Sequence, residues 1–265
     1  MKKLTKQMTV AALGGFLNVV PSHAAITTIM HLPMGEDGST GAGNIALDTS
    51  GNGYSMDTKE GVGSLTINTT TPAAPGSSSY TTFAGNAAMS TSLWRNDAAT
   101  ANLPADNFAM EFWVRHHSLA GHQRYVRSGT TGALTFSKLS NSPINLQRNG
   151  VASDSIHAMT PTVGQWYNIA IIRNNGISKL YVDGKEVVGD SFNGAPVWTG
   201  DYAIGQKSHT ENQQYFVGDM DELRMFTFGV GDDPVAALSI HAVPEPSSAA
   251  LLSLGGVSLI LRRRK

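Results

Sequence analysis

Two turn dipeptides, Asn175-Gly176 and Asp183-Gly184, constrain the fold of this 265-residue chain more than any other feature. Asn, Asp and Gly tolerate the positive φ angles that two-residue β-hairpin turns require. The dipeptides are flanked by short runs rich in apolar and β-branched residues, at 166–173, 179–182 and 185–188. The segment therefore predicts two successive antiparallel hairpins.

The first of these runs predicts a strand in the middle of a sheet. Successive side chains of a strand alternate between its two faces. Tyr167, Ile169 and Ile171 would share one face, and Trp166, Ala170 and Ile172 the other. Both faces are largely apolar, which is typical of a strand covered on both sides. We expect Trp166 to belong to the core.

Further β-rich runs recur along the chain, whereas no helical repeat of apolar residues persists. They lie at 108–114, 132–136, 215–217 and 222–228. Segment 63–82, rich in Ser, Thr, Pro and Gly, predicts a long surface connection around one weak strand. Charged residues make up only 15% of the chain, and the whole pattern predicts an all-β domain.

The first 24 residues predict a secretory signal peptide. Three lysines precede an apolar stretch at 8–20, and small residues then lead to a cleavage site after Ala24, with Ala25 as the alternative. We therefore expect the chain to be a substrate of the Sec export machinery.

The C-terminal residues have the layout of a membrane-directed signal. Val243-Pro244-Glu245-Pro246 precedes an uncharged apolar run at 249–261, and the chain ends in Arg262, Arg263, Arg264 and Lys265. As a helix this run would cover roughly 20 Å, less than the ~30 Å hydrocarbon core, so it predicts only transient contact with the inner membrane. The cations would stay on the cytoplasmic side. The alternative, a buried C-terminal helix, is opposed by four consecutive cations.

This tail resembles the PEP-CTERM sorting signal, because Val243 to Pro246 match the motif that names it. The resemblance implies that an exosortase, a membrane peptidase, cuts the chain near the motif in a Gram-negative bacterium that makes extracellular polysaccharide. It also implies that the body of the chain, residues 25–242, reaches the cell envelope, the outer surface or the extracellular matrix.

The net charge of the body limits which classes of partner it can be expected to bind. Seven of the nineteen Lys and Arg residues lie in the two signals, but only one of the twenty acids, Glu245, does, so twelve basic and nineteen acidic residues leave the body at −7. A negative body argues against nucleic acid and favours divalent cations. The absence of cysteine excludes disulfides, thiol catalysis and Cys-type zinc sites.

Four motifs in order resemble the concanavalin A-like, laminin-G-like family. They lie at 48–53, 108–115, 164–184 and 218–224, and the resemblance covers about 29–228. It implies a jelly-roll β-sandwich of two antiparallel sheets. Glucanases of this fold carry a Glu-x-Asp-x-x-Glu run on one strand, and 218–223 lacks the acids in the first and last positions. We therefore expect a non-catalytic protein.

Two acids in the last motif are candidate metal ligands. Asp219 and Asp221 alternate on a predicted strand, so they could share one face about 6 to 7 Å apart. The family resemblance implies a structural Ca²⁺ near this strand and the N-terminal loop, with Glu36, Asp48 and Asp221 as the main ligands. The alternative is that Asp219 and Asp221 cap turns or pair with Arg224.

Exposed aromatic rings could stack on a sugar. The candidates are Trp94, Trp113, Trp198 and Tyr202. Alternation places Trp113 on the outer face of its strand, where it would either form a glycan platform or pack beneath a loop. His116, His117 and His122 also cluster, but their spacing matches no metal-ligand motif and a polar loop explains them.

These observations predict an exported, non-catalytic β-sandwich that works in adhesion or in binding carbohydrate, such as exopolysaccharide. One alternative is a purely structural envelope or matrix protein. A glycan-active hydrolase is the second alternative, and the missing acid run opposes it.

Overall fold

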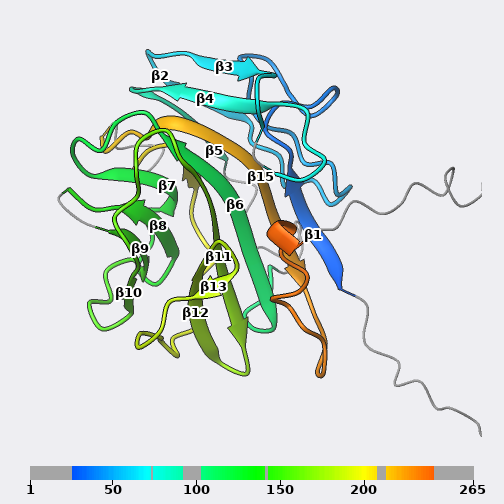
Figure 1. Cartoon of the computed structure of the whole chain (residues 1–265), viewed down its shortest axis with the longest axis vertical. Helices are drawn as coiled ribbons and strands as arrows, with labels where there is room; N and C mark the ends of the chain where they lie inside the picture. The colour runs from blue at the N-terminus through cyan, green and yellow to red at the C-terminus, as the bar shows by residue number, and fades with distance from the viewer. Residues whose placement is uncertain (1–25, 73, 92–102, 141–142, 208–212, 242–265) are drawn as a thin grey trace, which may run out of the picture.

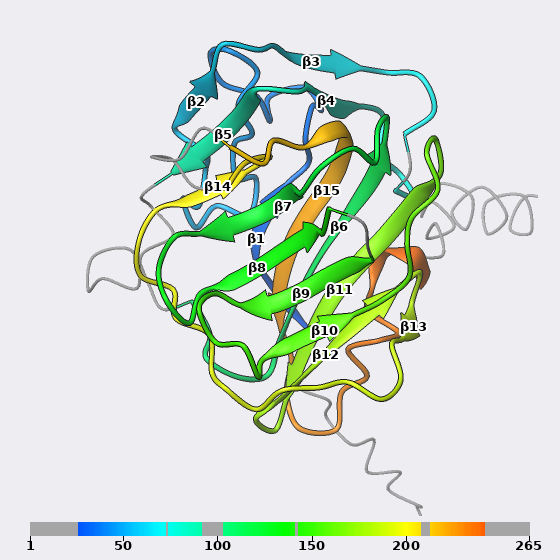
Figure 2. The ribbon, with the colours of Figure 1, turned by 90° about the vertical axis from the view of Figure 1, so that its left-hand side faces the viewer.

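Two antiparallel sheets pack face to face in the computed structural model, which describes residues 26–72, 74–91, 103–140, 143–207 and 213–241 (Figures 1 and 2). The expected signal peptide, Trp94 and the tail from Val243 onward lie outside these residues. The described part of the chain contains no helix with the length and apolar character that a bilayer span needs.

Each sheet is built from short strands. The eight-stranded sheet has the order β13 (Lys185–Glu186), β12 (Ile177–Val182), β11 (Trp166–Asn174), β6 (Phe108–His116), β15 (Val217–Thr227), β4 (Tyr80–Ala84) and β3 (Leu65–Asn68), with β1 (Thr27–Leu32) also paired to β15. The seven-stranded sheet has the order β10 (Ser155–His157), β9 (Ile144–Arg148), β8 (Leu134–Lys138), β7 (Gln123–Ser128), β14 (Tyr202–Ile204), β5 (Ala87–Thr91) and β2 (Thr58–Gly61). A short 3₁₀ helix, η1 (Ser239–His241), follows them.

The predicted pair of hairpins is confirmed. Strand β11 pairs with β12, and β12 pairs with β13. Asn175 and Gly176 have φ angles of 49° and 78°, and Asp183 and Gly184 have φ angles of 50° and 71°. Both turns therefore use the left-handed backbone that suits the twist of paired strands. Strand β11 also pairs with β6, so its predicted central position is correct.

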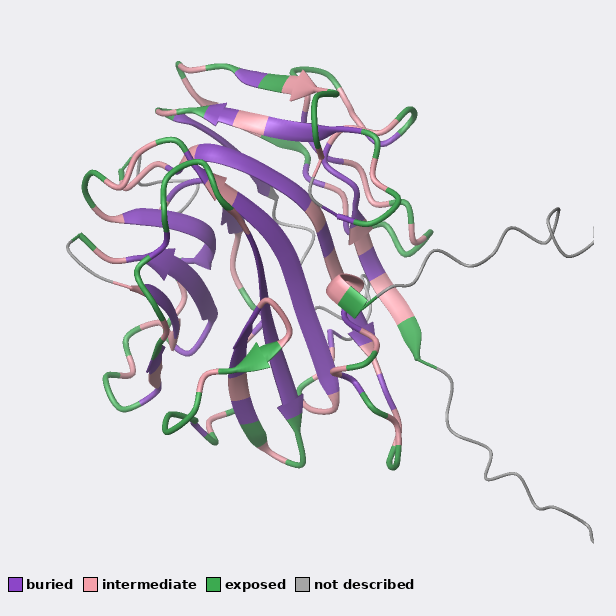
Figure 3. Ribbon diagram, in the orientation of Figure 1, coloured by how far each residue is buried: buried purple, intermediate pink, exposed green. Residues whose placement is uncertain are grey.

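The main core lies between the sheets. Tyr167, Ile169 and Ile171 of β11 face it, and Phe112 of β6 meets Phe136 of the other sheet edge to face, with ring centroids 5.1 Å apart. Figure 3 shows that burial is nearly continuous along β6 and β11. Because the chain has no disulfide, this apolar burial is a principal source of its stability.

The predicted runs 215–217 and 222–228 form one strand, β15, not two. A β-bulge between Asp221 and Arg224 shifts the register with β6, and Glu222 takes a positive φ of 49°. The extra residue breaks the alternation of inward and outward side chains.

The segment after β15 covers part of the outer face of the eight-stranded sheet. Residues 229–241, here called the C-terminal strap, end in η1, which lies beside this sheet in Figure 1. A second apolar cluster joins the strap to the sheet and contains Ala109, Ala170, Ile172, Tyr181, Phe226, Phe228 and Leu238, with Val235, Ala237 and Ile240 packed against it. The strap therefore explains why β11 is apolar on both faces.

A buried carboxylate fastens the strap. Glu111 of β6 is fully buried, and its Oε1 accepts a hydrogen bond of 2.9 Å from Nε of Arg224. Its Oε2 accepts bonds of 2.9 Å from both the backbone N–H and the hydroxyl of Ser239, and one of 3.1 Å from the amide of Asn168. The pairing of Arg224 with Asp219 or Asp221, one part of the alternative to a metal site, is not found, because the bulge brings Arg224 opposite Glu111.

Replacing Glu111 with Ala should lower the free energy of unfolding by about 3 kcal/mol, because it leaves Arg224 and the Ser239 N–H without their buried partner. Urea denaturation of the body would measure the loss. The control is Lys179→Ala, which removes the exposed ion pair with Glu186 and should lower stability by less than about 1 kcal/mol. Equal losses in the two variants would contradict the anchoring role of Glu111.

Candidate functional site

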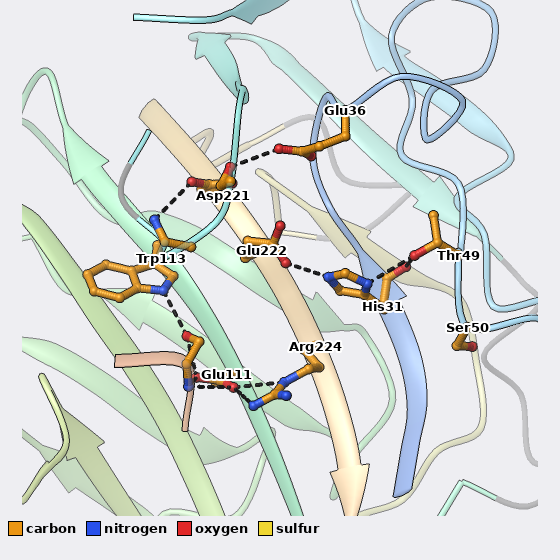
Figure 4. A network of polar contacts seen from close by, with 12 residues as sticks. His31, Glu36, Thr49, Ser50, Glu111, Trp113, Asp221, Glu222 and Arg224 are labelled. Carbon is orange, nitrogen blue, oxygen red and sulfur yellow. Dashed lines mark hydrogen bonds and ion pairs between the residues drawn. The ribbon is translucent and has the colours of Figure 1, made fainter. Parts of the chain in front are cut away.

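Three carboxylates converge where β15 bulges. Oxygens of Glu36, Asp221 and Glu222 all lie within 4.8 Å of one another. Glu36 is on the loop that follows β1, and the other two acids are consecutive on β15 (Figure 4). The bulge turns Glu222 toward the side that Asp221 occupies, so regular alternation no longer separates them.

The loop around Ser77 holds two of these acids in place. Oε1 of Glu36 accepts hydrogen bonds from the Ser77 hydroxyl at 2.8 Å and from the N–H groups of Ser78 and Ser79 at 3.1 Å. Oδ1 of Asp221 lies 3.0 Å from the same Ser77 hydroxyl oxygen, whose single proton is shared between the two carboxylates. One serine therefore fixes the distance between the two carboxylates.

Two features of this cluster suit a hard cation. Oε2 of Glu36 is buried and has no hydrogen-bond partner, and a buried unsatisfied acceptor carries a desolvation penalty. Three carboxylates at this spacing also repel one another, although Glu222 pairs with His31. Ca²⁺ takes oxygen ligands and would relieve both penalties. These residues therefore fit the metal that the family resemblance implies.

Asp48 is not part of this cluster. Its two oxygens accept four hydrogen bonds of 2.9 Å, from the N–H groups of His31, Ser50 and Tyr54 and from the Ser50 hydroxyl. These contacts tie the 48–54 loop to β1. Of the four expected metal ligands, the structure brings together Glu36 and Asp221, whereas Asp48 and Asp219 lie outside the group. Glu222 was missed, because alternation alone places it on the opposite face from Asp221.

Asp219 belongs to a second cluster on the outer face of the eight-stranded sheet, here called the Trp166 cluster. It consists of Tyr80, Arg115, His117, Trp166 and Asp219. The register sets Trp166 of β11 beside Arg115 of β6, and Arg115 beside Asp219 of β15. Asp219 is buried and accepts bonds of 2.7 Å from Nε of Arg115 and from Nε2 of His117.

Trp166 is only half-buried, so the expectation that it lies in the core is wrong. The Arg115 guanidinium lies 4.7 Å from the centroid of its ring, and the Tyr80 ring meets it edge to face at 5.4 Å. Its indole N–H has no hydrogen-bond partner. Burial by itself lowers the pKa of Arg115, but Asp219 and the Tyr80 hydroxyl outweigh that effect and raise the pKa. The guanidinium therefore stays charged against the ring.

Three other candidate aromatic side chains are buried, and for Trp113 this is the expected alternative of packing beneath a loop. Trp113 is 8% exposed and donates a bond of 2.9 Å to the Ser239 hydroxyl of the strap. Trp198 is 2% exposed and Tyr202 fully buried, and they donate to the carbonyls of Pro104 and Val197. Trp113 does lie on the outer face, as alternation predicts, but the strap covers it. A buried ring offers no face to a sugar.

The three histidines after β6 do not converge. His116 is buried and bonded to the Tyr125 hydroxyl, and burial, together with Lys138, lowers the pKa of its imidazole to about 4. His117 contacts Asp219. Among the described residues, the acid cluster of Glu36, Asp221 and Glu222 is the only group with metal-ligand spacing. The interpretation as polar loop residues holds for His117 and His122, whereas His116 is the last residue of β6 and is fully buried.

Known structures resemble this fold at low sequence identity. Domain 4 of AbnA, an extracellular GH43 arabinanase of Geobacillus stearothermophilus in complex with arabinotriose, is 17% identical over 81% of this chain and 98% of that domain, with a TM-score of 0.52. The receptor binding domain of botulinum neurotoxin D is 12% identical over 80% of this chain, with a TM-score of 0.53. The ligand binding domain of that serotype in complex with N-acetylneuraminic acid is 14% identical over 76% of this chain, with a TM-score of 0.50.

The chain spans about half the length of the toxin domains, 52% and 47%. A comparison with curated protein sequences finds no match. The family model of the concanavalin A-like lectin/glucanases superfamily matches residues 95–235, and the model of the PEP-CTERM protein-sorting motif matches residues 242–265. The chain therefore belongs to the concanavalin A-like lectin/glucanases superfamily and carries a PEP-CTERM sorting motif.

Proposed function

We propose that this chain is an exported, non-catalytic protein that binds carbohydrate at the cell surface or in the extracellular matrix. The observation that carries the proposal is the Trp166 cluster. Among the described tryptophans, Trp166 is the one that is not buried. It lies beside side chains with planar polar groups that are fixed by their contacts with Asp219.

This arrangement has the parts that sugar recognition needs. The partly exposed indole offers an apolar surface, and Arg115 and His117, whose side chains are 21% and 44% exposed, offer polar groups at its edge. Because Asp219 holds both side chains, little conformational entropy is lost when a ligand binds. The arabinotriose of the arabinanase domain and the N-acetylneuraminic acid of the toxin domain support carbohydrate as the ligand class.

The second candidate function is that of a purely structural matrix protein. The burial of Trp113, Trp198 and Tyr202 favours it, because three of the four expected platform residues serve packing. A hydrolase has less support, because the acids on this face already have firm partners: Glu111 pairs with Arg224, and Asp219 with Arg115.

Glycan-array screening of the body, followed by titration of the best ligand, tests the proposal. Trp166→Ala should raise the dissociation constant at least tenfold, about 1.4 kcal/mol, because the stacking surface is lost. The matched control is Trp113→Phe, which changes a ring beneath the strap and should leave the dissociation constant unchanged. Flat array responses, or equal affinity in Trp166→Ala, would leave the structural role.

We also propose that Glu36, Asp221 and Glu222 hold a structural Ca²⁺. The fit rests on the unpaired buried oxygen of Glu36 and on the mutual spacing of the three acids. The ion would cross-link the loop after β1 to the bulge of β15. Its effect would be on stability, and it is independent of the carbohydrate proposal.

Calcium at 100 times its dissociation constant should stabilise the body by about 2.7 kcal/mol, which raises Tm by about 5 to 10 °C. Asp221→Asn should abolish this rise, since it removes one of the three charges. Asp48→Asn should lower Tm but keep the calcium response, because Asp48 lies outside the cluster. Differential scanning calorimetry with EDTA or CaCl₂ measures both effects. An identical Tm for the unchanged protein in the two buffers would exclude the site.

The route to the surface follows from the two signals. We propose Sec export with cleavage after Ala24, transient inner-membrane contact through 249–261, and exosortase cleavage near Val243 to Pro246 in a Gram-negative cell. The strap ends at His241, so this cut would leave the sandwich whole. Mass spectrometry of the protein from its native cells should find both new termini. Recovery of the intact 265-residue chain from the cytosol would refute this route.

A further inference from the structure

A groove opens at one edge of the sandwich, between the last strands of the two sheets. These strands are β10 of the seven-stranded sheet and β13 of the eight-stranded sheet, and both lie at this edge in Figure 2. The groove has a volume of about 450 Å³ and lies between the end of β10 and the β12–β13 hairpin. Ala158 and Val187, which line it, also pack against the main core. The groove is therefore a place where that core comes close to the surface.

Apolar side chains form much of the groove. Met159, which is 43% exposed, lies on the β10 side, and Val182 and Val187 lie on the hairpin side. Exposed apolar surface of this kind is covered by water in the empty groove, and an apolar occupant would release that water. Methionine also adapts its shape to different partners, because its side chain is flexible and polarizable.

One exposed cation of the groove has no partner. Lys185 lines the groove, and its ammonium group contacts no acid among the described residues. The two acids beside it have other contacts: Oδ1 of Asp183 accepts a bond of 2.8 Å from the N–H of Asn168, and Glu186 pairs with Lys179. An exposed ion pair contributes less than about 1 kcal/mol. A carboxylate beside Lys185 would therefore orient an occupant more than it would hold it.

The chain itself leaves the sandwich beside this groove. His241, the last described residue, packs on the β12–β13 turn, where a Cβ on Gly184 would lie 2.5 Å from its Nε2. The two neighbours of Gly184, Asp183 and Lys185, both line the groove. Glu245 follows His241 by four residues, which is a reach of up to about 14 Å. The segment that follows the strap is therefore long enough to enter the groove and to bring Glu245 to Lys185.

The sequence of that segment matches the groove. Val243-Pro244-Glu245-Pro246 combines apolar side chains with one carboxylate. Each proline fixes its own φ at about −65° and biases the residue before it towards an extended backbone, so the sequence favours the polyproline II conformation. Segments of this kind lose little conformational entropy when they dock in an apolar groove. With three residues per turn, Val243 and Pro246 would share one face.

We propose that residues 243–246 dock in this groove, with Val243 and Pro246 against Met159 and with the Glu245 carboxylate beside Lys185. A peptidase must bind its target segment in its own active site, so the docked motif is withheld from cleavage. The rate of cleavage then follows the fraction of chains in which the motif is undocked. The sandwich would thus control access to its own sorting motif. This control rests on the exosortase route proposed above, whereas the docking does not.

Cross-linking with a carbodiimide tests the docking in detergent-purified chain that still carries the tail. This reagent joins a lysine to a carboxylate only where the two groups are in contact. The ion pair of Lys179 and Glu186, 2.8 Å apart, is an internal positive control. Mass spectrometry should also find Lys185 joined to Glu245 of the same molecule.

Two variants that add the same charge show whether the groove is responsible. Met159→Asp should lower the yield of the Lys185–Glu245 product about tenfold, because docking would then bury an unpaired carboxylate. Val188→Asp changes an 88% exposed side chain that does not line the groove, and it should leave the yield unchanged. Equal yields in the two variants would contradict the docking.

Other cross-linking results would also overturn the docking. They are a Lys179–Glu186 product without the Lys185–Glu245 product, equal joining of Glu245 to several lysines, and cross-linked dimers, which would assign the groove to a second copy of the chain.

Tail loss in the native cells tests the control of cleavage. Met159→Asp should lose the tail faster than Val188→Asp does, and equal rates would overturn this control. Absence of cleavage in every chain, the unchanged protein included, would refute the exosortase route, and the cross-linking result would still decide the docking.

Discussion

The organisation of this sandwich depends on one buried negative charge. Glu111 stands in the middle of the eight-stranded sheet with no exposed surface, and a carboxylate can be kept there only with charge and hydrogen-bond partners. Arg224 and Ser239 supply them, from β15 and from the strap. The strap then seals Trp113 and an apolar patch beside it. The part of the sheet beyond the strap, around Trp166, stays within reach of solvent.

The bulge in β15 has a comparable local effect. One extra residue lets a single strand use Asp219 to position Arg115, Asp221 and Glu222 to form an acid cluster, and Arg224 to neutralise Glu111. A regular strand would have placed Glu222 on the core side, where an acid is costly. Much of the chemistry on this face thus follows from one register shift.

The sequence predicted those features of the fold that local residue patterns determine. Turn chemistry and alternation gave the 166–188 hairpins, the central position of β11 and the outward direction of Trp113. Contacts between distant segments could not be settled by local patterns. Because the strap has no periodic pattern, the sequence left open whether Trp113 is exposed or packs beneath a loop, and it did not predict the pairing of Arg224 with Glu111. The burial of Arg124 and Arg127 in β7 was not predicted either. A buried sheet face that is lined by polar residues does not give the apolar alternation by which a buried strand is found in a sequence.

The acids of the body are not spread evenly. The −7 of the body suggested cations as partners, and three of its nineteen acids, Glu36, Asp221 and Glu222, converge near the β15 bulge. The net charge alone does not locate such a cluster.

The strap would have a mechanical consequence if the sorted protein were held by its C-terminal end. Any tension on the tail reaches residues 229–241 before it reaches a strand. The strap is held by side chains and a few backbone contacts and not by a ladder of strand pairing, so it would detach first and lengthen the tether while the two sheets stay intact. Detachment would also expose Trp113 to solvent. Tension on the tail would therefore change which aromatic side chains are accessible on this face.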